Sequence, residues 1–267
     1  MWTLGADRYP WQPTLPTVPI PEEPATIEAF VTAMEGANVT NAVLVQTSVY
    51  GWDNSYLCDS LDRYPGRFAG ICLVDPRSEH AADDLRHWCE VRGCQGVRLN
   101  TITQADAGWL LEPTMKKLWD AAADLGASVS LQMEPGHADI VNALAHRRPE
   151  ITFIVDCIAA KVYREADAEV VVDTLAEPPN VFMKLVSFGQ DSREPYPFRD
   201  LWPFFGRAVA KFGPERMVFG TDFPHVLAAC SYSQAVDWLD ELPFVDAEAR
   251  AMIAEGTARE LWKFRGN

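Results

Sequence analysis

Short apolar runs alternate with amphipathic segments along almost the whole chain of 267 residues. The runs are rich in Val, Ile, Leu and Phe, which is typical of parallel strands covered on both faces. Seven of them are expected strands: Ala42–Gln46, Phe68–Asp75, Gly96–Asn100, Ser128–Met133, Thr152–Cys157, Val181–Val186 and Met217–Asp222. The expected helices are Thr26–Ala37, Asn54–Arg63, Ala81–Val91, Met115–Leu125, His137–Ala145, Ala168–Ala176, Trp202–Lys211, Gln234–Leu239 and Ala247–Trp262. This alternation predicts right-handed βαβ units and a parallel sheet.

The pattern fits the α/β class, and two architectures are open. A doubly wound sheet is possible, but seven strands with following helices favour a (β/α)8 TIM-type barrel that lacks one strand. The missing strand is expected to be the first, because the chain opens with a proline-rich loop and only three residues precede Leu4. No repeat or linker is visible, so residues 1–267 are expected to form a single domain.

The composition of the chain limits the kinds of molecule that it is expected to bind. The formal net charge of −15 argues against nucleic acid or an anionic membrane surface. No apolar run approaches the ~20 residues of a membrane span. The start of the chain has no basic, apolar leader, so a cytoplasmic location is expected. A homo-oligomer is possible. None of the six cysteines is in a Cys-x-x-Cys pair, which favours free buried thiols over disulfides.

The segment that carries the clearest chemistry is Gly220-Thr221-Asp222-Phe223-Pro224-His225, which follows the apolar run Met217-Val218-Phe219. It places an acid at the carboxyl end of a strand, where catalytic side chains of a barrel converge. Asp222 could take a proton from water or bind a metal. It could equally close a turn or cap the next helix. His225 could orient a substrate or assist proton transfer, or be a hydrogen-bonded structural residue.

Two cations lie in expected strands. Arg98 suits a substrate carboxylate because its guanidinium is planar and forked, although a salt bridge within the protein is the alternative. Lys184 could neutralise an anionic intermediate if it points inward. An outward Lys184 under a helix end is the other interpretation.

Four uncharged residues are further candidates for substrate binding. Ser48, Tyr50 and Asn54 follow the first expected strand and could bind a carbonyl or carboxylate oxygen, or simply cap the loop. Gln132 lies within a strand, Ser128–Met133, that otherwise looks buried, so its amide needs a partner or a place in the pocket. His137, which follows the end of the same strand after Glu134-Pro135-Gly136, could also approach the pocket.

Several motifs, taken together and in order, carry a family resemblance over nearly the whole chain. They are Arg8-Tyr9-Pro10-Trp11, Val45-Gln46-Thr47-Ser48-Val49-Tyr50-Gly51, Asp53-Asn54-Ser55-Tyr56-Leu57, Tyr64-Pro65-Gly66-Arg67-Phe68, Gly96-Val97-Arg98-Leu99-Asn100 and Gly220-Thr221-Asp222-Phe223-Pro224-His225. The chain resembles the amidohydrolase superfamily, in particular the group related to 2-pyrone-4,6-dicarboxylate lactonase and the sugar lactonases. The resemblance implies a distorted (β/α)8 barrel.

The chain departs from that family at its metal positions. The family's first strand ends in His-x-His, and aligning Trp2 with the aromatic residue that follows places both histidines before Met1. Either the start is assigned too late or the first strand has been lost. The family's Asp-His pair is Asp156-Cys157 here, and a cysteine thiolate can bind zinc or lie buried as a free thiol.

Asp222 and Cys157 are therefore the only metal ligands that the resemblance offers, too few for a tight zinc site. Some lactonases of the group work without metal. The resemblance thus implies that no cofactor is required, with zinc possible only if the upstream histidines exist.

Three functions follow. The leading hypothesis is hydrolysis of a lactone or related cyclic ester of a small carboxylic acid, with water activated by Asp222 and the substrate held by Arg98, Lys184 or His225. The second is a metal-dependent non-oxidative decarboxylase of the same superfamily. The third is a catalytically silent or truncated barrel that only binds a small acid.

Overall fold

All seven predicted strands are present in the computed structural model, which describes residues 1, 3, 7–14, 23–102, 104–156, 168–186, 189 and 192–264. They are β1 (Ala42–Val45), β2 (Phe68–Leu73), β3 (Gly96–Asn100), β4 (Ser128–Gln132), β5 (Phe153–Asp156), β6 (Val181–Leu185) and β7 (Met217–Phe219). Most of their residues are buried, as the unbroken apolar runs require. The last strand ends at Phe219, three residues earlier than predicted, and a turn begins at Phe223.

The order of the strands decides between the two predicted architectures. Neighbouring strands are hydrogen-bonded in sequence order from β1 to β7. The pairs β1–β2, β2–β3, β5–β6 and β6–β7 are all parallel. A doubly wound sheet reverses its order near the middle. Sequential parallel pairing instead agrees with an α/β fold of the TIM type.

The predicted helices are also present, with their ends shifted by a few residues. They are α1 (Ile27–Gly36), α2 (Ser55–Arg63), α3 (Ala81–Arg86), α4 (Lys116–Leu125), α5 (Ala138–Arg147), α7 (Ala168–Ala176), α9 (Trp202–Phe212), α10 (Tyr232–Asp237), α11 (Ala247–Ala251) and α12 (Thr257–Leu261). Two predicted helices are interrupted. A wide π turn, η2 (His87–Val91), follows α3, and another, η10 (Met252–Gly256), separates α11 from α12.

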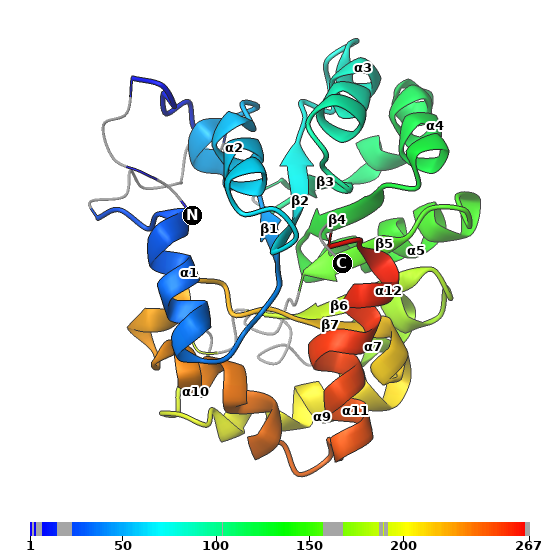
Figure 1. Cartoon of the computed structure of the whole chain (residues 1–267). Helices are drawn as coiled ribbons and strands as arrows, with labels where there is room; N and C mark the ends of the chain where they lie inside the picture. The colour runs from blue at the N-terminus through cyan, green and yellow to red at the C-terminus, as the bar shows by residue number, and fades with distance from the viewer. Residues whose placement is uncertain are drawn as a thin grey trace. The chain divides into compact units, whose positions relative to one another are not determined.

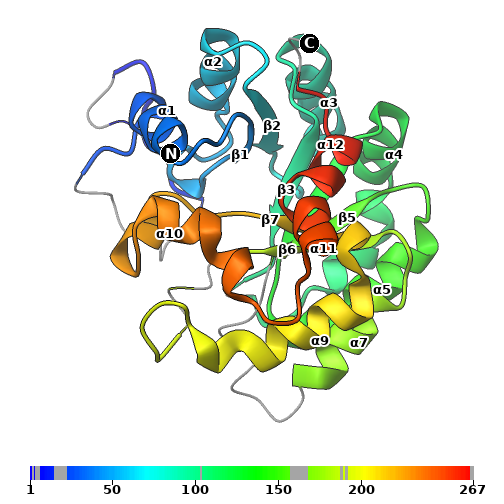
Figure 2. The same ribbon diagram turned by 60° about the horizontal axis from the view of Figure 1, so that its bottom comes forward.

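The chain divides into two compact units. Unit 1 comprises Met1–Leu99, Thr114–Ser130 and Trp262–Asn267, and unit 2 comprises Asn100–Pro113 and Leu131–Leu261. In unit 1, strands β1 to β3 are accompanied by α1 to α4, with α3 packed beside α4 (Figure 1). In unit 2, strands β5 to β7 are accompanied by α5, α7 and α9, which pack in succession (Figure 2). A single domain over residues 1–267 stays a prediction.

The carboxyl-terminal segment of the chain is fastened to the start of β3 and β4 within unit 1. The Trp262 indole donates to Ser128 Oγ at 3.0 Å. The backbone of Lys263 exchanges two hydrogen bonds of 2.7 Å with the Gln95 amide. Gly96 is needed at this junction, because a Cβ there would lie 2.6 Å from the Ser128 carbonyl oxygen and closer still to Ser128 Oγ.

Gly96→Ala is therefore expected to lower the free energy of unfolding by about 1–3 kcal/mol, the usual cost of overpacking. Urea unfolding followed by circular dichroism measures this change. Gly36→Ala is the matched control, because nothing lies within 4 Å of the added Cβ at the end of α1. The control should be neutral or slightly stabilising. Equal stability of the two variants would contradict the close approach of β3 to Ser128.

Candidate functional site

A buried ion pair lies at the carboxyl ends of β5 and β6 in unit 2. Asp156 and Lys184 are opposite each other in the parallel register. Lys184 Nζ lies 2.6 Å from Asp156 Oδ1, and the two side chains are only 16 % and 9 % exposed. Neither predicted orientation of Lys184 named this partner: its ammonium meets the carboxylate of Asp156 on the neighbouring strand. A buried pair of this kind supplies fixed charge where little water competes.

Asp222 follows the next strand of the same unit. Lys184 is opposite Val218 in the register, and the Gly220 N–H donates to the Leu185 carbonyl at 2.9 Å. The Asp222 backbone has φ of 55°. This left-handed conformation is uncommon for residues other than glycine, but aspartate tolerates it better than most. This backbone conformation, at a partly buried position, is consistent with an Asp222 side chain that is held in one orientation.

The rest of the Gly220–His225 motif forms the turn that leaves β7. The Val226 N–H donates to the Asp222 carbonyl at 3.3 Å. His225 is exposed and begins the short 3-10 helix η8 (His225–Ala228). A Cβ on Gly220 would lie 3.8 Å from Lys184 Cδ, so the Lys184 side chain passes close to the start of this turn. The chain thus brings Lys184 and the motif near each other at adjacent strand ends.

A second polar cluster follows β4 in unit 2. His137 is 5 % exposed, and its Nδ1 lies 3.1 Å from Thr101 Oγ1. The Glu134 N–H donates to the same nitrogen at 3.4 Å, so Nδ1 accepts and the ring proton is assigned to Nε2. The Thr101 N–H donates to the Gln132 carbonyl at 2.8 Å. The sequence signal for His137 was its place after a strand end, but Thr101 gave no signal of its own.

In unit 1, Asn54 is wholly buried and its side chain completes the end of β2. Its Oδ1 accepts the Leu73 N–H at 2.8 Å, and its Nδ2 donates to the carbonyls of Leu73 at 2.9 Å and Trp52 at 3.1 Å. The Asn54 amide therefore forms, at Leu73, the two hydrogen bonds that a neighbouring strand would otherwise form. A role for Asn54 as a substrate ligand stays a prediction, but its amide already binds three backbone groups.

Asn54→Leu is expected to lower the free energy of unfolding by about 2–4 kcal/mol, because the buried N–H and C=O of Leu73 lose their partner. Chemical denaturation monitored by tryptophan fluorescence measures the loss. Asn41→Leu is a suitable control. Its amide donates one bond of 2.8 Å to the Gly66 carbonyl at a partly buried site, so a smaller loss is expected. A loss at Asn54 no larger than at Asn41 would contradict this bridging role.

The other predicted residues of unit 1 are placed as follows. Tyr50 is 1 % exposed and its hydroxyl accepts the Thr3 N–H at 2.8 Å. Burial, the largest effect, raises the Tyr50 pKa to about 12, so the phenol stays neutral at neutral pH. Ser48 is partly buried, and its carbonyl accepts the N–H groups of Thr14 and Gly51. Arg98 is partly buried in β3, opposite Leu73 of β2. Substrate binding by these residues stays a prediction.

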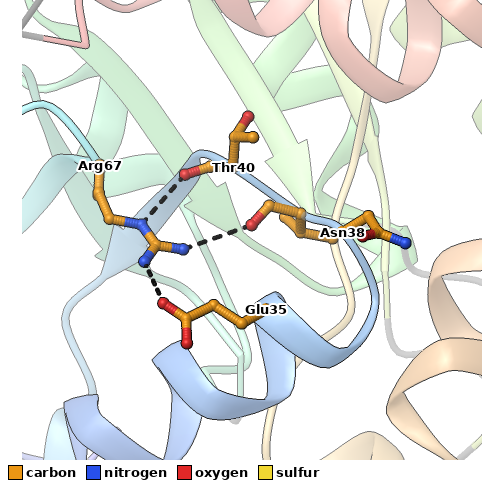
Figure 3. Close-up of a pocket in the computed structure, with 5 residues that line it drawn as sticks. Glu35, Asn38, Thr40 and Arg67 are labelled. Atoms are coloured by element: carbon orange, nitrogen blue, oxygen red, sulfur yellow. Dashed lines mark hydrogen bonds and ion pairs between the residues drawn. The ribbon is translucent and has the colours of Figure 1, made fainter.

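A shallow pocket in unit 1 lies near the amino ends of β1 and β2. It is lined by Glu35, Asn38, Val39, Thr40 and Arg67 (Figure 3). The Arg67 guanidinium donates to Glu35 Oε1 at 2.8 Å, to the Thr40 carbonyl at 3.3 Å and to the Val39 carbonyl at 3.5 Å. These bonds hold the turn between α1 and β1. Because this is the amino end of the strands, we assign the pocket to stability and not to chemistry.

A bound zinc ion would need several His, Cys, Asp or Glu side chains close to one another. Within the ranges that the structure describes, no three His, Cys, Asp or Glu residues are grouped so as to hold a metal ion. Cys157, one of the two predicted ligands, lies outside the described residues. Asp156 beside it is bonded to the Lys184 ammonium. The described residues therefore do not fit a resident metal ion.

The chain belongs to the amidohydrolase family, whose model (Amidohydro_2) matches residues 5–264. Among characterised relatives, 4-sulfomuconolactone hydrolase of Hydrogenophaga intermedia is 25 % identical over 82 % of this chain and 70 % of its own length. L-fucono-1,5-lactonase of Burkholderia ambifaria is 23 % identical over 98 % of this chain and 92 % of its own.

The fold is also that of a solved structure, a probable 2-pyrone-4,6-dicarboxylic acid hydrolase from Acinetobacter baumannii with citric acid bound. The TM-score is 0.79 at 20 % identity, covering 94 % of this chain and 96 % of that one. The homologues are thus lactone hydrolases, and the family supports an enzyme of the hydrolase class.

Two further predictions concern the location of the protein and its assembly. No helix in the described part of the chain is both long enough and apolar enough to cross a membrane. A cytoplasmic location and a homo-oligomer stay predictions.

Proposed function

We propose that the chain hydrolyses a lactone or related cyclic ester of a small carboxylic acid. The observation that carries the proposal is the position of Asp222 three residues after β7, which pairs with β6, the strand that carries Lys184 of the Lys184–Asp156 pair. The names of the relatives, two lactone hydrolases, support the same reaction class. A distorted (β/α)8 barrel, with its first strand absent or truncated in this chain, is part of the proposal.

Asp222 is proposed to act as the general base. It takes a proton from water as the water oxygen bonds to the lactone carbonyl carbon. The bond between that carbon and the ring oxygen then breaks, and the ring oxygen takes up a proton. General base action contributes about 10²–10⁴-fold in rate, so positioning and charge must supply the rest of the acceleration.

Lys184 is proposed to stabilise the negative charge that develops on the carbonyl oxygen. An ammonium already fixed by Asp156 needs little reorganisation when that charge appears. Arg98 is proposed to bind a carboxylate of the substrate, for which its forked donors are suited. Gln132, Ser48 and His225 are proposed to orient the substrate.

Tyr50 and Asn54 are proposed to contribute through the loop after β1. Tyr50 is anchored to the backbone of Thr3, and Asn54 to that of Leu73. Their side chains thereby fix the shape of the segment that carries Ser48.

The direct test is a panel of lactones assayed by proton release with a pH indicator and by mass of the product. The panel contains sugar 1,5-lactones, muconolactones and pyrone dicarboxylates, each beside an analogue without the acid group. We expect ring opening of at least one acidic lactone and a lower kcat/KM for its neutral analogue. Release of CO2 from an aromatic acid would favour a decarboxylase instead. Folded protein that binds the acids but turns none over would overturn the proposal.

A further inference from the structure

Four cysteines, Cys58, Cys72, Cys89 and Cys94, lie in unit 1. Cys58 on α2 and Cys72 on β2 are 0 % exposed, and Cys94, just before β3, is 3 % exposed. Cys89, in the π turn η2, is partly exposed. The four come from separate parts of the chain and have no role in the chemistry proposed for Asp222.

Two of the thiols are in contact. Cys58 Sγ lies 3.8 Å from Cys94 Sγ. Burial, the largest effect, and the neighbouring thiols of Cys89 and Cys94 raise the pKa of Cys72. Within the described ranges, no three of these or other His, Cys, Asp and Glu side chains are grouped to hold a metal ion. The contact between Cys58 and Cys94 brings two sulfur atoms close enough for a reaction between them to be considered.

We propose that Cys58 and Cys94 form a reversible disulfide when the protein meets a peroxide. The two sulfur atoms must approach from 3.8 Å to about 2.05 Å. Cys94 can contribute to this movement because it lies in an irregular segment between the π turn and β3. Cys72 is less able to move, since its strand β2 is paired on one side with β1 and on the other with β3.

Cys94 is the thiol suited to react first. Hydrogen bonds from the thiols of Cys58 and Cys72 hold the pKa of Cys94 below its ordinary value, with help from the nearby Arg92 guanidinium and against the effect of burial. Arg92 is itself fixed by a bond of 2.8 Å to Asp59 on α2. A thiolate is the nucleophilic form of cysteine, and a neighbouring thiol can resolve its oxidised form.

The reaction balances with hydrogen peroxide as the oxidant. The Cys94 thiolate attacks one peroxide oxygen, so an S–O bond forms, the O–O bond breaks and hydroxide leaves. The Cys58 sulfur then attacks the Cys94 sulfur. The S–S bond forms, the S–O bond breaks and a second hydroxide leaves. The two thiols lose two electrons and two protons, and the peroxide becomes two molecules of water. The new bond ties α2 to the segment that enters β3.

The test uses the full chain treated with graded hydrogen peroxide at neutral pH. Remaining thiols are alkylated under denaturing conditions, and the protein is cut with trypsin before mass spectrometry. Cleavage after Lys and Arg places Cys58, Cys72, Cys89 and Cys94 on four different peptides, residues 9–63, 68–77, 87–92 and 93–98. We expect peptides 9–63 and 93–98 to be joined, with a mass lower by two hydrogens, and to separate after dithiothreitol.

A matched pair of variants sharpens the result. Cys58→Ser should abolish the linked pair of peptides, whereas Cys230→Ser, which changes a partly exposed cysteine of unit 2, should leave it unchanged. If Cys58→Ser does not fold, the peptide analysis of the unmodified chain still tests the proposal. The proposal is overturned if peroxide that oxidises Cys230 leaves Cys58 and Cys94 as free thiols, or if Cys94 links to Cys72 instead.

Discussion

Replacing Asp222 with asparagine should reduce kcat/KM for the preferred lactone by at least about 10²-fold, because the variant has no carboxylate to accept a proton from water. Asparagine has nearly the same size and tolerates the left-handed backbone found at this position, with φ of 55°. The fold should therefore survive, and the loss should appear mainly in kcat. Steady-state kinetics on the best substrate of the panel measure it.

Asp106→Asn is the matched control for charge. Asp106 is an exposed turn residue whose carboxylate accepts the Gly108 N–H at 2.7 Å, a bond that asparagine can also accept. Both variants change the net charge by the same amount, and only Asp222→Asn should lose activity. A melting temperature like that of the unmodified chain shows that the loss is chemical. An Asp222→Asn variant that keeps more than a tenth of the activity would rule out Asp222 as the base.

Replacing Lys184 with methionine should lower the free energy of unfolding by about 3–5 kcal/mol, because it leaves a buried carboxylate without its cation. Asp156 is 7 % exposed, so water cannot compensate well for the lost ammonium. Combining Lys184→Met with Asp156→Leu removes both charges and should restore most of the stability. Urea unfolding of the two variants and the unmodified chain measures both effects.

Lys211→Met provides the comparison at an exposed site. Lys211 Nζ lies 3.2 Å from Asp173, but the two side chains are 45 % and 39 % exposed. Its loss should cost no more than about 1 kcal/mol, as for other surface pairs. A Lys184→Met variant as stable as Lys211→Met would show that the pair at the ends of β5 and β6 is well solvated in solution.

The strands could be predicted because each apolar run is bounded by residues that end a strand. The predicted ends of β2 and β7 were too late: β2 ends at Leu73, and β7 ends at Phe219, before Asp222 takes positive φ. The helix predictions missed the π turns η2 and η10. These insert residues without changing the amphipathic pattern enough to be visible in the sequence.

The individual roles of polar residues were harder to predict, because their partners are distant in the chain. The Asp156 partner of Lys184 was not predicted, because it lies on a neighbouring strand. The partner of the Tyr50 hydroxyl is the backbone of Thr3, and that of the Asn54 amide is the backbone of Leu73. Backbone N–H and C=O groups are present in nearly every residue, so the residue types could not indicate which of them would be the partners.

The most direct test of the central claim, that Asp222 activates water, follows oxygen during turnover in water enriched with ¹⁸O. General base catalysis transfers the label straight from water to the new carboxylate of the product. Mass spectrometry after several turnovers should then find ¹⁸O in the product and none in the peptide that contains Asp222. Label in the Asp222 carboxylate would mean that this residue attacks the lactone itself, and would contradict the mechanism.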